Sequence, residues 1–211
     1  MQVKNQVYYH VHRINEHSNK WSVGTTYDAT RKELNLFNSF YDNHSLQTQI
    51  VTGQPQYLLQ SISSYNNLSQ PQRVNIIDRY LGEFIEALKE HCKFIREVIF
   101  EEVRQNYFPQ LPSRRTCIWL CEQDAVSYWW NQLGNNTKKI LKLQVTGTIH
   151  EADQRHLNQD TYSHDIFRRN AFNYWTGTDN LNNIEKEILF EGLIDIIEEY
   201  ADLETFNNRM V

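Results

Sequence analysis

Apolar residues recur at helical spacing over a long internal segment, from Pro71 to about Tyr107. The apolar positions are Ile77, Leu81, Phe84, Ile85, Leu88, Cys92, Ile95, Val98, Ile99 and Val103. Steps of three and four residues place them on one face, so the segment is expected to form one long or two shorter amphipathic helices. Ser69 suits the N-cap, and Pro109 and Pro112 end the helical segment.

Strand patterns lie at the start of the chain and in its second half. They cover residues 7–13, 117–120, 140–149 and 188–197, with a short helix expected at 125–133. Residues 24–70 give no clear pattern, and residues 150–183 contain a polar segment around Tyr174 and Trp175. Strands at both ends of the chain and helices grouped between them predict an α+β fold.

Length, charge and cysteine content limit the possible classes of protein. A chain of 211 residues with 40 % apolar residues can bury the core of one domain, so residues 1–211 are expected to form a single domain with a helical insertion at about 71–107. The net charge of −5 limits any nucleic-acid contact to a local basic patch. Three cysteines without metal-ligand spacing, with no apolar run for a signal peptide or membrane span, predict a reduced, cytoplasmic protein without a membrane partner.

Three short motifs contain residues suited to chemistry. Glu185-Lys186-Glu187 leads directly into the apolar run that begins at Ile188, so Glu187 is expected at the mouth of a strand, with its carboxylate held by a rigid element. His10 and His12 alternate on the first strand and should face the same side. Between these motifs, a strand with Trp119 precedes a helix that contains an aromatic cluster starting at Tyr128.

The ordered motifs resemble those of the histidine-type ADP-ribosyltransferases, the branch that includes the poly-ADP-ribose polymerases and the DarT-like toxins. Tyr9-His10 is similar to the first motif of that branch, Trp119 with Tyr128 to the second, and Glu187-Ile188-Leu189 to the third. A small bacterial family of this superfamily, with members that look like phage-defence toxins, is similar in its combination of Tyr8-Tyr9-His10, Pro112-Ser113-Arg114, Cys117-Ile118-Trp119-Leu120 and Tyr174-Trp175. The resemblance implies a pair of packed β-sheets with a helical insertion. Val11 replaces the glycine of the polymerases, and Trp119 replaces their usual tyrosine.

The resemblance implies that NAD is the substrate and that no metal is needed. Glu187 would stabilise the sugar cation that forms as nicotinamide leaves, because hydrogen bonds to a neighbouring hydroxyl strengthen in such transition states. Trp119 or Tyr128 would stack on the cationic nicotinamide ring, and His10 would hydrogen-bond a ribose hydroxyl. The pyrophosphate could be bound by Arg13, Arg114 or Arg115. The residues expected to contact NAD are Tyr9, His10, Val11, Arg13, Arg114, Trp119 and Tyr128.

The acceptor of ADP-ribose is predicted less directly than the donor. The toxin-like resemblance favours a nucleic acid, with RNA slightly ahead of DNA, held by cations such as Lys138, Lys139, Arg168 and Arg169. Glu185, two positions before Glu187, instead resembles the first Glu of arginine-modifying transferases, which would make the acceptor a protein. In this superfamily the loop before the catalytic Glu, here about 176–186, helps to choose the acceptor. A toxin of this kind also implies an antitoxin or chaperone, bound at the helical insertion or over the groove leading to Glu187.

Other functions fit the same residues. Water as the acceptor would give an NAD glycohydrolase, and the same fold could serve as a non-catalytic binding module. Taken singly, His10 and Trp119 also fit structural roles, and Glu187 fits a solvated strand end. His150, Glu151, Asp153 and His156 could suggest a metal site, but such spacings are common in proteins without one.

Overall fold

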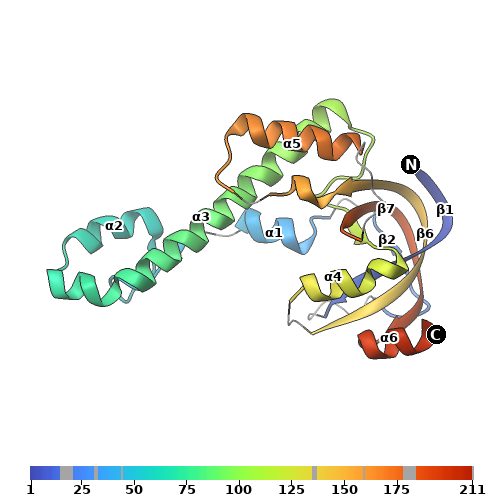
Figure 1. Ribbon diagram of the computed structural model, residues 1–211, viewed down its shortest axis with the longest axis horizontal. Coiled ribbons are helices and arrows are strands. Elements are labelled where there is room, and N and C mark those ends of the chain that lie inside the picture. The colour runs from blue at the N-terminus through green and yellow to red at the C-terminus, as the bar shows by residue number, and fades with distance from the viewer. Residues whose placement is uncertain are drawn as a thin grey trace.

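The computed structural model describes residues 1–14, 21–30, 33–43, 45–134, 137–158, 160–177 and 184–210. Its main sheet has five strands: β1 (Gln2–Arg13), β2 (Thr26–Asp28), β5 (Ile118–Leu120), β6 (Lys138–Asp153) and β7 (Lys186–Tyr200). β6 lies between β1 and β7, and both β2 and β5 pair with the other side of β7. All of these pairings are antiparallel. Long strands from the two ends of the chain thus build one sheet, to the right in Figure 1.

The main sheet curls until its edges meet. Just after β5, Cys121 exchanges two backbone hydrogen bonds with Tyr9 of β1, at N···O distances of 2.8 and 2.9 Å. Strong bending is possible where β6 and β7 cross closely at Gly147 and Gly192. A Cβ at Gly147 would lie 2.3 Å from the carbonyl oxygen of Glu191, so no larger residue fits without a backbone shift.

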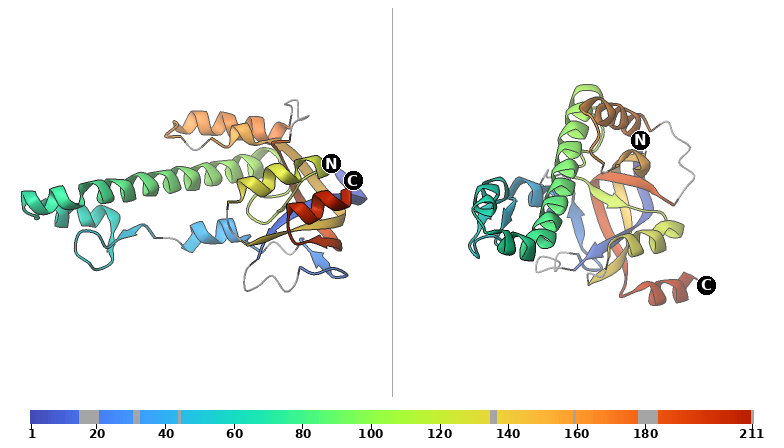
Figure 2. Two further views of the ribbon diagram at one scale, coloured as in Figure 1. Left: turned by 60° about the horizontal axis from the view of Figure 1, so that its bottom comes forward. Right: turned by 60° about the vertical axis from the view of Figure 1, so that its left-hand side comes forward.

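Six α-helices accompany the sheet in the described part of the chain. They are α1 (Leu36–Asn43), α2 (Leu58–Asn66), α3 (Gln70–Tyr107), α4 (Val126–Gln132), α5 (His164–Thr176) and α6 (Leu203–Met210). The C-terminal half of α3 packs beside α5 near the sheet, and its N-terminal half extends away from the sheet with α2 beside it (Figures 1 and 2). Two short strands, β3 (Gln47–Thr48) and β4 (Gln56–Tyr57), form a hairpin beside the same part of α3. The N-terminal half of α3, α2 and this hairpin are called the arm below.

The inner and outer faces of the curled sheet have different cores. Alternating residues of β6 and β7, such as Leu143 and Ile188, join Tyr8 in a cluster on the inner face. On the outer face, Leu189 of β7 packs with residues of α3 and α5. A third cluster, also on the outer face, joins Tyr9 to α4 and α6. Side chains of neighbouring strand residues therefore enter different environments.

The α+β class predicted from the sequence is confirmed, but the sheet arrangement differs in detail. In place of a pair of packed sheets, the described strands form one curled sheet with a small separate hairpin. The helical segment is a single helix of 38 residues, and Gln72 accepts a hydrogen bond from the backbone N–H of its N-cap, Ser69. The prediction of a polar segment around Tyr174 is wrong, because Tyr174 belongs to α5 and is fully buried.

Candidate functional site

Glu187 is the second residue of β7 and lies on the outer face of the sheet. It pairs with Ala152 of β6 and projects to the same side as Leu189, toward α3 and α5. Only 10 % of its side chain is exposed. The expected position at the mouth of the last strand is therefore found, but the carboxylate is largely enclosed.

One oxygen of the Glu187 carboxylate is held by two donors. The Arg114 guanidinium hydrogen-bonds Oε2 through Nη1, and the Tyr174 hydroxyl donates to the same oxygen at 2.7 Å. Arg114 Nη1 also donates to the Tyr174 hydroxyl oxygen at 2.7 Å, which closes a triangle of contacts. No described residue hydrogen-bonds the other oxygen, Oε1. The site thus fixes the orientation of the carboxylate while one of its acceptor oxygens remains available.

A second carboxylate completes the environment of Arg114. Glu97 of α3 accepts from Arg114 Nε at 2.9 Å and also pairs with Arg96 at 2.7 Å. Burial alone would lower the pKa of Arg114, but the carboxylates of Glu187 and Glu97 raise it well above its ordinary value. Burial alone would raise the pKa of Glu97, but Arg114 and Arg96 bring it below its ordinary value. The buried charges therefore balance one another.

Trp119 lies beside this network. Its ring centroid is 5.8 Å from the guanidinium carbon of Arg114, a cation–π distance, and 6.4 Å from the ring centroid of Phe37 in α1. Trp119 pairs with Leu189 across β5 and β7. The structure therefore brings together two of the three residues expected to act on NAD, Trp119 and Glu187.

His10 lies on the opposite face of the sheet from Glu187. Its ring packs against Trp21 at a centroid distance of 5.4 Å, within the inner cluster, and against His12 at 5.5 Å. Burial lowers the pKa of His10, with a smaller opposing effect of its hydrogen bond to the Trp119 carbonyl. Nδ1 of His10 lies 2.8 Å from that carbonyl oxygen. Strand alternation therefore separates the His10 ring from the Glu187 carboxylate, and the structure does not bring these two residues together.

Arg114 also differs from its expected role. It was expected to meet the pyrophosphate of NAD, but only 4 % of the residue is exposed and each of its guanidinium nitrogens bonds a carboxylate or Tyr174. Arg115 pairs with Asp42 at 2.7 Å on the surface. Arg13, at the end of β1, has Nη2 at 3.4 Å from the Leu133 carbonyl.

The remaining residues expected at NAD are spread over the third cluster and its edge. Tyr9 is 4 % exposed and packs edge-on against Phe206 of α6 at 5.4 Å. Val11 is buried opposite Ile140 of β6. Tyr128 lies on α4, where its hydroxyl accepts a hydrogen bond from Gln154. These three residues do not join the Glu187 network.

The segments expected to select the acceptor are described only in part. Glu185 lies in the turn just before β7, and residues 178–183 of the expected acceptor loop lie outside the described residues. The expected cations do not gather in one groove. Lys138 and Lys139 begin β6, at the far end of that strand from Ala152, whereas Arg168 lies on α5 and pairs with Glu102 of α3.

The sequence analysis did not place Tyr174 or Glu97 at the site, although these two residues orient Glu187 and Arg114. Phe167, Ala171 and Tyr174 follow helical spacing after the N-cap Ser163, and this signal could have identified α5. No comparable signal marks Glu97, because a buried Glu on a long charged helix resembles its exposed neighbours in sequence.

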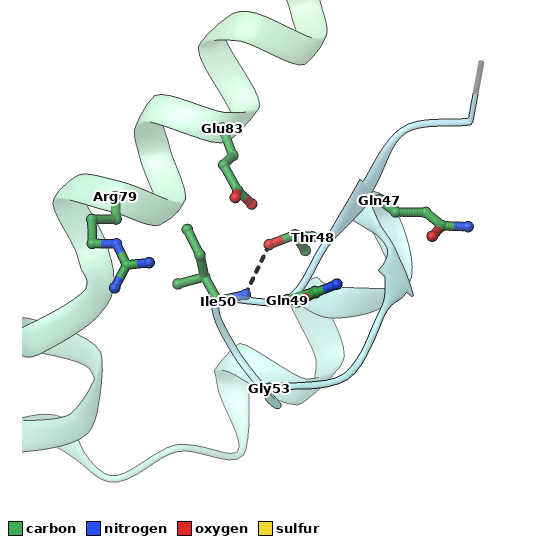
Figure 3. A pocket seen from close by; sticks show the side chains of 7 residues that line it. All are labelled: Gln47, Thr48, Gln49, Ile50, Gly53, Arg79 and Glu83. Carbon is green, nitrogen blue, oxygen red and sulfur yellow. Dashed lines mark hydrogen bonds between the residues drawn. The ribbon is translucent and has the colours of Figure 1, made fainter.

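A hollow of about 600 Å³ lies elsewhere, on the arm (Figure 3). Arg79 and Glu83 of α3 line it on one side, and the turn between Thr48 and Gly53 lines the other. None of the residues expected to bind NAD lines this hollow.

Comparison with known proteins gives a family but no activity. The model of a family described as "Protein of unknown function (DUF2441)" matches residues 8–202. All of the candidate residues from Tyr9 to Glu187 lie within this range. No curated protein matches the chain. No described helix has the length and apolar character required to cross a membrane.

Proposed function

We propose that this chain, which belongs to the DUF2441 family, is an NAD-dependent mono-ADP-ribosyltransferase in which Glu187 acts on the ribose of NAD. One observation carries the proposal. Arg114 and Tyr174 fix Oε2 of Glu187, Oε1 has no hydrogen-bond partner among the described residues, and an indole lies beside the same network. A carboxylate fixed in this way suits the stabilisation of positive charge that develops on a sugar.

The proposed reaction transfers ADP-ribose from nicotinamide to an acceptor. The bond between the anomeric carbon and the nicotinamide nitrogen breaks, and nicotinamide leaves as a neutral ring with the bonding electron pair. A nucleophilic oxygen or nitrogen of the acceptor forms the new bond and releases one proton. Glu187 would accept a hydrogen bond from the adjacent 2-hydroxyl, and that bond strengthens as the sugar becomes cationic. Trp119 would stack on the nicotinamide ring, a cation–π contact of about 0.5–2 kcal/mol that weakens once the ring is neutral.

His10 has a positioning role in this proposal. Its hydrogen bond to the Trp119 carbonyl ties β1 to β5 and thereby supports the strand that presents the indole. Tyr174 supports Glu187 in the same way from α5. Neither residue has to touch NAD for the reaction to proceed.

The acceptor proposed is a nucleic acid, with RNA slightly favoured over DNA. This choice rests on the resemblance to toxin-like transferases, as does the proposal that the protein is an intracellular toxin restrained by an antitoxin or chaperone. A protein arginine is the alternative acceptor, supported by the position of Glu185 just before Glu187. Water as the acceptor would make the protein an NAD glycohydrolase.

The test uses NAD labelled in its adenylate part, purified protein, and RNA, DNA or cell extract. Label should move to a macromolecule, and Glu187→Gln should abolish the transfer. Glu199→Gln is the matched control, since Glu199 is an ion-paired carboxylate at the other end of β7, 38 % exposed at its side chain, and should keep full transfer. Failure of the wild type to transfer label or to release nicotinamide with any acceptor would refute the proposal.

A non-catalytic binding module is the second candidate. The observation that favours it is the combination of a Glu187 carboxylate already ion-paired by Arg114 with a His10 on the opposite face of the sheet. Calorimetry with NAD separates the two candidates. Micromolar binding that weakens strongly in Trp119→Ala supports the transferase, and the absence of NAD binding in folded wild-type protein supports the module.

A further inference from the structure

The N-terminal half of α3 carries an exposed stripe of large apolar side chains. This apolar stripe consists of Val74, Ile77, Leu81, Ile85 and Leu88, which are 66, 38, 54, 47 and 52 % exposed. Steps of three or four residues place all five on one face of the helix. Contiguous apolar surface of this kind, unlike a single exposed Leu, marks a site of interaction.

The same face of α3 is already covered farther along the helix. Cys92, Ile99 and Val103 continue the helical spacing of the stripe and are buried. There α3 packs against α5, through residues such as Phe167 and Ala171. Figure 2 shows α5 beside the C-terminal half of α3 only. One apolar line along α3 therefore has a helical neighbour over half of its length.

The helix α2 does not cover the stripe. It packs on a different side of α3 through Tyr65, which stacks on Tyr80 at a ring-centroid distance of 5.1 Å. Ser61 of α2 also hydrogen-bonds the Tyr80 hydroxyl. With α2 on this flank, the five stripe residues stay accessible to a helix from another molecule.

We propose that the stripe binds the stripe of a second copy of this chain, so that two α3 helices pair antiparallel about a two-fold axis. A helix of the same chain offers the same length of apolar surface, as a two-fold interface requires. A parallel pair is sterically blocked, since the second α3 would run into the place that α5 occupies beyond Leu88. In the antiparallel pair the two sheets lie at opposite ends, and the helices interlock as in a short coiled coil.

Charges beside the stripe match this arrangement. When Ile77 of one copy packs opposite Leu88 of the other, their neighbours Asp78 and Lys89 lie on the same flank of the pair. No described residue forms an ion pair with Asp78. Among the described residues Lys89 pairs only with Glu86, at 2.7 Å, and both of those side chains are more than half exposed. The two-fold axis repeats the contact, which gives two ion pairs for each dimer.

Gly82 provides space on the side of the stripe that carries Asp78 and Lys89. A Cβ at Gly82 would meet nothing within 4 Å, so the second helix could approach closely there. The dimer does not depend on the proposed NAD chemistry, because none of the stripe residues belongs to the Glu187 network.

The test is the mass of the full chain in solution, measured by light scattering and sedimentation over a range of protein concentrations. Wild-type protein should be a dimer. Leu81→Glu should raise the dissociation constant at least about tenfold, equivalent to 1.4 kcal/mol or more. The matched control is Val98→Glu, at a residue of the same helix that is 50 % exposed but lies off the stripe, and it should remain a dimer.

Charge-exchange and cysteine variants test the antiparallel register. Asp78→Lys should weaken the dimer, and the addition of Lys89→Asp should restore it. A mixture of Ile77→Cys and Leu88→Cys proteins should form disulfide-linked dimers faster than either variant alone. Wild-type protein that is monomeric up to its solubility limit, or a folded Leu81→Glu variant with unchanged dimerisation, would overturn the proposal.

Discussion

Replacement of Arg114 by Met should destabilise the protein more than most single substitutions. The side chain of Met fills much of the same volume but leaves the carboxylates of Glu97 and Glu187 without their shared cation. Arg114 is 4 % exposed and bonds Glu97 at 2.9 and 3.3 Å, besides its contacts with Tyr174 and Glu187. Removal of one partner from a buried ion pair typically costs about 3–5 kcal/mol, because a buried charge loses its compensation.

Two remaining contacts limit this loss. Glu97 keeps its pair with Arg96, and Glu187 keeps the hydrogen bond from Tyr174. We therefore expect a loss of about 3–5 kcal/mol in the free energy of unfolding and not more, which a domain with about 5–15 kcal/mol of stability can survive.

Urea unfolding followed by circular dichroism measures the effect. Arg115→Met is the matched control: Arg115 adjoins Arg114 but forms an ion pair whose side chains are 41 and 38 % exposed, so its loss should cost about 0–1 kcal/mol. In the Arg114→Met background, Glu187→Gln should cost less than in the wild type, because it removes a charge that is no longer paired. An Arg114→Met loss below about 1 kcal/mol would refute the assignment of a buried, tightly coupled network.

Three other predictions follow from named contacts. Burial holds the pKa of His12 at about 3 and that of His150 at about 4, so the unfolded state binds more protons below pH 6.5. Stability should therefore fall as the pH is lowered from 6.5 to 5, by up to about 1.4 kcal/mol per pH unit for each His, and His12→Gln should reduce the slope measured by denaturant unfolding. Gly147→Ala should lose about 1–3 kcal/mol of stability, measured by thermal unfolding, because its Cβ meets the opposing backbone. Trp119→Ala should raise the NAD dissociation constant, measured by calorimetry, at least about tenfold if the indole stacks on nicotinamide, and unchanged affinity would contradict that role.

The elements with a strong local signal were predictable from the sequence. The α3 helix begins within one residue of its expected start because its apolar periodicity and the Ser69 cap agree. The last strand was expected from Ile188, and the structure extends it to begin at Lys186. The ends of such helices and strands depend on residues nearby in the sequence, so they can be predicted without knowledge of the tertiary structure.

The arrangement of the site was less predictable. Strand alternation showed that His10 and His12 share a face, but it could not relate that face to the one of Glu187, because the curl of the sheet and the bridge from Tyr9 to Cys121 are tertiary features. The pairing of Arg114 with Glu97 joins residues far apart in the chain and depends on where α3 packs.

Release of nicotinamide from NAD, followed by chromatography with and without RNA, tests the central claim most directly. Wild-type protein should release nicotinamide, and Glu187→Gln should slow the release by about 100-fold or more while the dissociation constant of NAD changes by less than about threefold. That split would place the carboxylate in the transition state and not in ground-state binding. A folded Glu187→Gln protein that releases nicotinamide at the wild-type rate would contradict the account.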